Sequence, residues 1–166
     1  MASRMGHHAE IVHGGIEMGA DPGFRLDEYV KQRGSDLVCF TLHWHLQLYE
    51  VFQASRTVAR SCPGVKILLG GIAATGFARE IMNEWDHVHF LISGEAESAL
   101  GSLIHSGFEA PEEIPNLSWR DETGHPRHNP VSYFASPGRL DDFSHVNIRL
   151  MRHHEYYRGR YFFDAR

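Results

Sequence analysis

The sequence has few cysteines and no long apolar run. It contains 2 cysteines in 166 residues, Cys39 and Cys62, too few for the disulfide framework of a small secreted domain. No apolar run approaches the roughly 18 residues that cross a bilayer. The first eight residues also lack the apolar stretch of a secretory signal. We therefore expect a cytoplasmic protein with two free thiols and no membrane partner.

The sequence also has fewer basic residues than acidic residues. The chain has 16 lysines and arginines against 21 aspartates and glutamates, which gives a formal net charge of -5, and no basic block stands out. The electrostatic footprint of a nucleic-acid-binding protein is therefore missing, and we expect no nucleic-acid partner. Apolar residues (42%) and charged residues (22%) have the proportions of an ordinary globular domain that can bury a core.

Four short apolar runs alternate with longer amphipathic stretches. Short apolar runs bounded by glycine are typical of strands buried on both faces. The predicted strands span residues 9–12, 36–42, 65–69 and 87–92. Apolar residues at helical spacing predict helices over residues 24–34, 46–62, 76–85 and 97–106. The alternation predicts an α/β fold, a flavodoxin-like (Rossmann-type) doubly wound parallel sheet with helices on both faces.

The pattern changes after Gly107. Two short runs, residues 117–120 and 126–130, flank the turn Asp121-Glu122-Thr123-Gly124, which is typical of an exposed β-hairpin. Residues 131–145 show no clear period and predict an extended tail. The sequence thus divides into an α/β domain over residues 1–110 and a hairpin with a linker over residues 111–166.

The ends of the predicted strands are the candidate ligand site. Ligands of open α/β sheets bind beyond the carboxyl ends of the strands, and glycine there lets a backbone approach a ligand closely. The candidate binding residues are Thr41, Leu42, His43, Trp44, Gly70, Gly71, Ile72, Ser93, Gly94 and Glu95. The alternative for the Gly70-Gly71 pair is that it only turns the chain into the next helix.

The order of these residues is similar to that of cobalamin-binding domains. Thr41 and a leucine close one run, Gly70-Gly71 closes the next, and Gly94-Glu95 closes the last. In cobalamin-binding domains, Ser/Thr-x-Leu and Gly-Gly line the pocket for the nucleotide tail of the cofactor. Here the leucine follows Thr41 directly rather than after one residue.

Three segments in order, residues 68–75, 91–97 and 114–120, resemble more specifically the N-terminal domain of cobalamin-dependent radical S-adenosylmethionine enzymes. The resemblance covers roughly residues 8–166. It implies a corrinoid as the small-molecule partner and a radical S-adenosylmethionine catalytic domain in a full-length parent. The parent would use the corrinoid for methyl transfer or another radical reaction. This chain would be a binding module without catalytic machinery of its own.

Three features depart from the family pattern. The chain has no Asp-x-His-x-x-Gly motif, so no cobalt ligand from that loop is expected. The family's central first strand has no counterpart; residues 146–150, residues 161–163, a second chain or a rearranged sheet would have to fill its place. The two cysteines cannot supply three thiolates to one cluster, so an iron–sulfur cluster and S-adenosylmethionine are expected only in the parent.

The apparent loss of a central strand supports a different hypothesis. An open sheet edge exposes unpaired backbone groups and invites a partner strand. In this alternative the chain is a degenerate α/β module that binds no cofactor and forms homo-oligomers through the open edge.

Histidine is abundant, at 13 residues. His43 and His45 follow a predicted strand, and His87 and His89 lie two apart on another, a spacing at which two imidazoles can reach one metal ion. Metal ion binding is therefore a third hypothesis. A structural role, partly buried against packed helices, is the stronger alternative for His87 and His89, and no residue is assigned as a metal ligand. Glu95 and Glu97 fit the N-terminus of a helix better than an acid–base pair.

Overall fold

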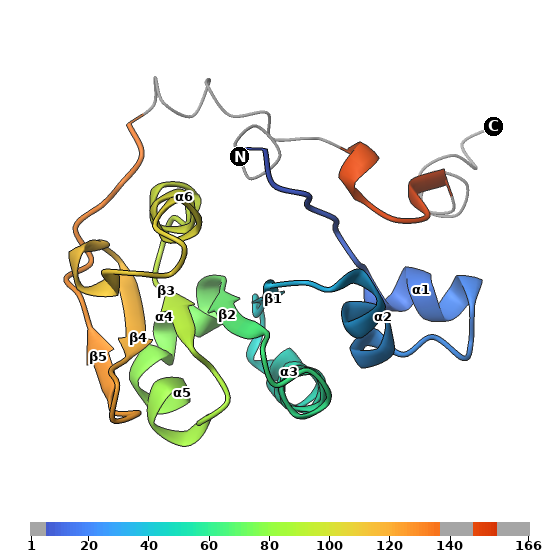
Figure 1. Ribbon diagram of the computed structural model, residues 1–166, viewed down its shortest axis with the longest axis horizontal. Helices are drawn as coiled ribbons and strands as arrows, with labels where there is room; N and C mark the ends of the chain where they lie inside the picture. The colour runs from blue at the N-terminus through green and yellow to red at the C-terminus, as the bar shows by residue number, and fades with distance from the viewer. Residues whose placement is uncertain (1–5, 137–147, 156–166) are drawn as a thin grey trace. The chain divides into compact units, whose positions relative to one another are not determined.

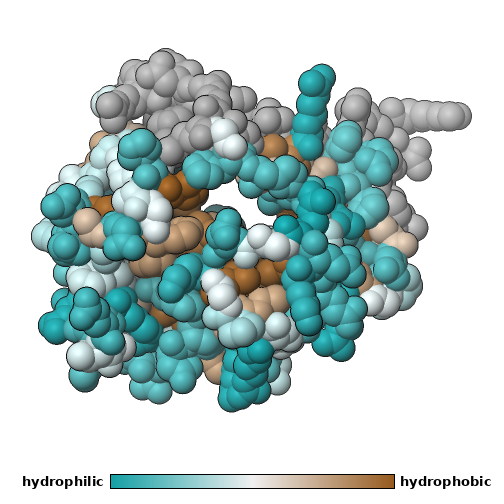
Figure 2. All heavy atoms as spheres, in the orientation of Figure 1, coloured by the Kyte–Doolittle hydropathy of each residue, from teal (hydrophilic) through white to brown (hydrophobic). Residues whose placement is uncertain are grey.

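The computed structural model describes residues 6–136 and 148–155 (Figure 1). The chain divides into two compact units. The sheet unit comprises residues 27–135, and the terminal unit combines residues 1–26 with residues 136–166. In the space-filling view, hydrophilic residues cover much of the visible face, and apolar residues appear between them (Figure 2).

The sheet unit is built on one five-stranded sheet with the order β1-β2-β3-β4-β5. Its strands are β1 (Leu37–Thr41), β2 (Lys66–Gly70), β3 (Phe90–Ile92), β4 (Leu117–Arg120) and β5 (Pro126–His128). The first three strands are parallel, β4 is antiparallel to β3, and β5 is antiparallel to β4. Only β4 therefore runs against the others, and the sheet is mixed but mostly parallel. The predicted α/β class is confirmed.

Helices cover both faces of this sheet, with α6 on one face and α3 and α5 on the other (Figure 1). The helices of the sheet unit are α2 (Leu26–Arg33), α3 (Leu48–Ser61), α4 (Ile72–Gly76), α5 (Ala78–Glu84) and α6 (Glu97–His105), with 3-10 turns at η2 (His45–Gln47) and η3 (Pro111–Glu113). The helix predicted over residues 76–85 begins earlier, at Ile72, and is divided at Phe77 into α4 and α5.

The core on the α6 face follows the two-residue period of the strands. Leu68 of β2 and Phe90 and Ile92 of β3 point to this face and pack with Ala99 and Leu103 of α6. The β2 and β3 strands are buried over most of their length, as the continuous apolar runs predict.

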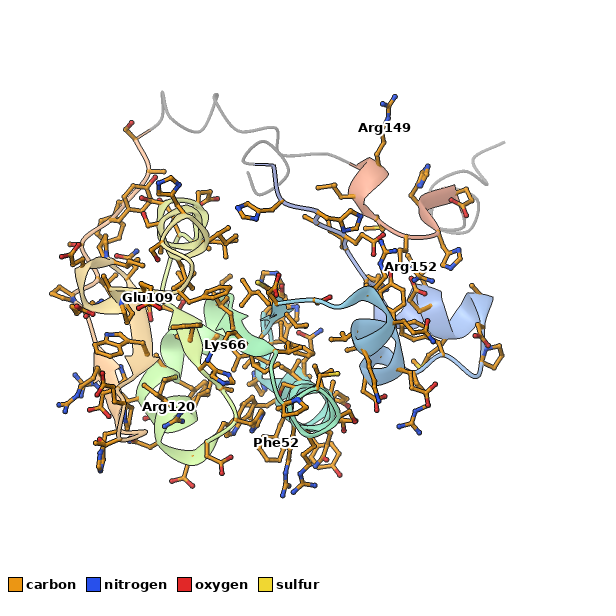
Figure 3. All side chains as sticks on the ribbon, in the orientation of Figure 1. Phe52, Lys66, Glu109, Arg120, Arg149 and Arg152 are labelled. Carbon is orange, nitrogen blue, oxygen red and sulfur yellow. The ribbon has the colours of Figure 1, made fainter. Side chains whose placement is uncertain are left out.

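The predicted hairpin is confirmed. Its strands, β4 and β5, are part of the five-stranded sheet rather than an exposed addition to it. Leu117 pairs with Ile92 of β3 and is fully buried, so β4 extends the same core. The Arg120 guanidinium donates hydrogen bonds to the carbonyls of Met82 (2.5 Å), Trp85 (2.9 Å) and Val88 (2.8 Å) and fastens β4 to the end of α5 (Figure 3). The boundary near residue 110 stays a prediction.

The prediction of a strand over residues 9–12 is wrong. Ile11 forms only an isolated parallel bridge with Met151. Just beyond it the His13 Nδ1 accepts a hydrogen bond from the Ile16 N–H (3.3 Å) and caps helix α1 (Gly14–Ala20), so the chain turns into a helix where a longer strand would continue.

The terminal unit brings together segments from both ends of the sequence. Glu17 of α1 is buried, and its carboxylate faces Arg152 Nε at 3.2 Å and His153 Nε2 at 3.7 Å (Figure 3). Residues Ile148–Leu150 form a 3-10 turn, η4, rather than a strand. Residues 146–147 and 161–163, which were candidates for the missing strand, lie outside the described residues. In the described part of the chain, no helix combines the length and apolar character needed to cross a membrane.

Candidate functional site

The carboxyl ends of β1, β2 and β3 lie at one edge of the sheet because these strands are parallel. Thr41 is the register partner of Gly70, and the Leu42 N–H donates a hydrogen bond to the Gly70 carbonyl (2.8 Å). The structure therefore brings the candidate residues after β1 and β2 together, with Thr41 and Gly70 on the same face of the sheet.

The two glycines after β2 have different roles. Gly71 has a φ of +109°, and a Cβ there would lie 2.6 Å from the Leu42 carbonyl oxygen. That oxygen also accepts hydrogen bonds from the N–H groups of Ala73 (3.1 Å) and Ala74 (3.3 Å). Gly71 is thus required by the packing of the chain on itself. A Cβ on Gly70 would meet nothing within 4 Å, so Gly70 leaves open space beside Thr41.

The remaining candidates after β1 and β2 include both core and surface residues. The Leu42 side chain is completely buried and belongs to the core. Thr41 and His43 are exposed. Trp44 and Ile72 are large apolar side chains that remain 67% and 78% exposed at this edge of the sheet. Solvent-exposed apolar side chains beside an open backbone are suited to contact with a partly apolar ligand.

The candidates after β3 already have partners within the chain. Ser93 is buried, and its N–H donates to the Asn116 carbonyl (2.9 Å). The Glu95 carboxylate accepts a hydrogen bond from the Ala135 N–H. These contacts hold the chain segment that leaves the sheet. A role in ligand binding for Ser93, Gly94 and Glu95 stays a prediction.

Sequence reasoning gave no role to Thr75 or Asn116. The Thr75 hydroxyl donates to the Gly71 carbonyl (3.0 Å) and accepts from the Gly94 N–H (2.9 Å). The buried Asn116 accepts from the N–H groups of Ser132 (3.0 Å) and Tyr133 (2.9 Å) through its Oδ1. Both residues lie in the segments that carry the family resemblance. Gly94, Ser132 and Tyr133 are 16 to 19 residues from their partners, too distant in sequence for spacing to reveal these contacts.

His87 is part of the packing between α3 and the start of β3. Its Nε2 lies 2.8 Å from the Ser55 hydroxyl, which itself donates to the Phe52 carbonyl (3.1 Å). The Ser55 hydroxyl thus links His87 to α3. The imidazole is stacked on Trp85 at a centroid distance of 6.1 Å, and burial lowers its pKa.

The His89 side chain supplies a hydrogen-bond acceptor to the backbone of β2. Its Nδ1 accepts a hydrogen bond from the Ile67 N–H (3.1 Å), which requires this nitrogen to be unprotonated. Burial, followed by the charges of Lys66 and Arg120, lowers the pKa of His89 to about 4. The structure thus gives His87 and His89 structural partners. In residues 6–136 and 148–155, no group of three or more His, Cys, Asp and Glu side chains is placed to hold a metal ion.

A separate open hollow of about 510 Å³ lies beside the N-terminal end of α3. It is lined by His45, Leu46, Leu48, Tyr49, Phe52 and Trp85. None of these residues belongs to the candidate set at the strand ends. His45 thus lines this hollow, whose lining does not include Gly70 or Thr41.

No family model matches the chain, and no curated protein matches it. Among solved structures, the fold is similar to part of the cobalamin-dependent S-adenosylmethionine radical enzyme OxsB. The similarity holds for the structure with aqua-cobalamin and S-adenosylmethionine bound and for the one with aqua-cobalamin bound, each with a TM-score of 0.50 and 12% sequence identity. The match covers 64% of this chain and 15% of that enzyme. At this identity, the similarity concerns the fold.

Proposed function

We propose that the chain binds a corrinoid across the carboxyl ends of β1 and β2 and positions it for a radical S-adenosylmethionine domain in a longer parent. The observation that carries the proposal is the open space at Gly70 beside the exposed Thr41, with the exposed apolar side chains of Trp44 and Ile72 in the segments that follow the two strands. The similar fold of an enzyme solved with aqua-cobalamin supports this choice of ligand.

The residues at this edge fit the chemistry of a corrinoid. The cofactor presents a flat nucleotide base and a ring with many apolar and amide groups. Gly70 permits a close approach of the base, and the Thr41 hydroxyl can donate to or accept from a polar atom. Trp44 and Ile72 offer apolar contact. The bound corrinoid would supply the group-transfer chemistry at cobalt, while the chain supplies binding and orientation.

A titration of the full chain with hydroxocobalamin, followed by gel filtration, tests the proposal. We expect the corrinoid to coelute with the protein and its visible bands to shift. The band positions would report whether a nearby histidine such as His43 ligates cobalt. A colourless protein peak at high micromolar concentrations of both components would contradict the proposal.

A matched pair of glycine variants locates the site. Gly70→Val places a side chain in the open space at the end of β2, and we expect it to weaken corrinoid binding about tenfold or more. Gly64→Val is the control, because Gly64 precedes the same strand and a Cβ there also meets nothing within 4 Å. Equal binding by both variants would place the ligand elsewhere.

Self-association through β1 is the second candidate function. In the described residues, β1 pairs on one side only, and its sequence Leu-Val-Cys-Phe-Thr contains no charged residue and no proline. Exposed edge strands are usually protected by such residues. Sedimentation velocity over a hundredfold range of concentration tests this candidate, and a monomer throughout would remove it.

A further inference from the structure

Thr75 connects the loops that follow β2 and β3. Its hydroxyl donates to the carbonyl of Gly71 (3.0 Å) and accepts from the N–H of Gly94 (2.9 Å). The Gly71 carbonyl also accepts from the Thr75 N–H (2.9 Å), so the hydroxyl is a second donor to the end of β2 and the acceptor for a backbone N–H at the end of β3. Both loops belong to the candidate binding edge.

The register of the sheet does not extend to the two loops. The β2–β3 ladder pairs Leu68 with Phe90 and Leu69 with Leu91, so this register ends before either loop begins. Gly71 and Gly94 both have positive φ values, +109° and +76°, and glycine offers no side chain with which to anchor itself. In the described residues, the Thr75 hydroxyl joins one loop to the other by hydrogen bonds beyond the ladder.

Each loop is also fixed on its outer side. The Gly71 loop lies against the Leu42 backbone after β1, and Ser93 is bonded through its N–H to Asn116 before β4. Thr75 closes the gap between these two fixed points. A hydrogen-bonded connection therefore runs along the edge of the sheet from β1 to β4.

We propose that Thr75 is a positioning residue for the corrinoid site, which sets the separation of the Gly70-Gly71 and Ser93-Gly94 loops. This inference rests on the proposed function. Without the hydroxyl, the Gly94 N–H loses its acceptor and the hydrogen-bonded connection between the two loops is lost. A ligand that contacts both loops then has to order them as it binds, which weakens its affinity.

Thr75→Val removes the hydroxyl while it keeps the branched shape of the side chain, and Thr75→Ser restores the hydroxyl. We expect the valine variant to bind hydroxocobalamin about tenfold more weakly and the serine variant to bind within about threefold of the unchanged protein. Thr57→Val is the matched control. The Thr57 hydroxyl also bonds a backbone carbonyl, that of Gln53 (2.8 Å), but it lies on α3 away from both loops.

Hydrogen exchange of the Gly94 amide, followed by NMR on the same variants, gives a readout that does not need the corrinoid. We expect this amide to be protected in the unchanged chain, in Thr75→Ser and in Thr57→Val, and to exchange rapidly in Thr75→Val. A Gly94 amide that exchanges rapidly in the unchanged chain would overturn the inference. Thr75→Ala serves as the deletion variant should the valine variant not fold.

The two readouts separate the inference from the proposed function. An unchanged chain that binds no corrinoid contradicts the proposed function, and with it any role of Thr75 in binding, while amide exchange still decides whether Thr75 joins the loops. If the unchanged chain binds corrinoid and Thr75→Val binds equally well despite rapid Gly94 exchange, the positioning role is wrong and the binding function stands.

Discussion

The two outer strands of the sheet have contrasting chemistry. The β5 strand consists of Pro126, Arg127 and His128, and Arg127 forms an ion pair with Asp121 at 2.7 Å. The β1 strand has no charge and no proline, and its Cys39 and Thr41 are exposed while the rest of the strand is half-buried. Proline and charge protect an edge strand from further pairing, and β5 has both.

The contrast shows which edge of the sheet has the composition of an edge strand and which does not. On the hairpin side, the Arg120 guanidinium and the Asn116 and Asn129 amides form hydrogen bonds with backbone groups. The β1 side has the composition of an interior strand and ends in an open space at Gly70. The proposed corrinoid site and the proposed self-association edge both lie on the β1 side.

Gly71→Ala should have the largest effect. The added Cβ would meet the Leu42 carbonyl oxygen at 2.6 Å, at a φ of +109° that non-glycine residues rarely adopt. We expect a loss of about 3 kcal/mol in the free energy of unfolding, measured by urea denaturation. Gly70→Ala is the neighbouring control and should change stability by no more than about 0.5 kcal/mol. Similar losses in the two variants would contradict the distinction between these glycines.

Arg120→Met should have the next largest effect. The change leaves the carbonyls of Met82, Trp85 and Val88 without their charged donor, and we expect a loss of about 2 kcal/mol in the free energy of unfolding. Arg127→Met in the same hairpin removes only a surface ion pair and should cost less than about 1 kcal/mol. A smaller effect at residue 120 than at residue 127 would show that Arg120 does not fasten the hairpin.

The pH dependence of the free energy of unfolding tests the role of His89, which lies between β2 and β3. The pKa of His89 is lowered to about 4 in the folded chain, from 6.5 in the absence of its surroundings. The unfolded chain therefore binds a proton at this residue more readily, and stability should fall as the pH decreases from about 6.5 towards 4.

Urea denaturation at several pH values between 7 and 4.5 measures this dependence. His89→Asn keeps an acceptor near the Ile67 N–H but does not titrate, so we expect a flatter dependence. His105→Asn, at an exposed position at the end of α6, is the control and should keep the original slope. An unchanged slope in the His89 variant would exclude His89 as its source.

Cys39→Lys should have the smallest effect on stability and sharpens the comparison of the two edges. It gives β1 the kind of charge that β5 already has. We expect a change of less than about 0.5 kcal/mol in unfolding free energy. If the unchanged chain self-associates through β1, the variant should sediment as a monomer. Self-association that persists in the variant would exclude this edge as the interface.

Much of the sheet unit could be predicted from local patterns. Three of the four apolar runs form strands, and the amphipathic stretch that ends before Pro63 forms α3. The run at residues 9–12 led to a wrong prediction of a strand. Its apolar composition suits a strand, but His13 caps a helix that begins directly after it. A short run carries too little periodicity to decide between such outcomes.

The candidate edge could be chosen from the sequence, but the contacts that its residues make could not. The sequence determined that glycines and a hydroxyl residue stand at the ends of the apolar runs, and these runs can be recognised because strands follow a local pattern of neighbouring residues. Only the tertiary structure decided that Gly70 is open while Gly71 lies against Leu42, and that Thr75 joins Gly71 to Gly94. These roles depend on backbone groups far apart in the sequence, which approach one another only when the chain is folded.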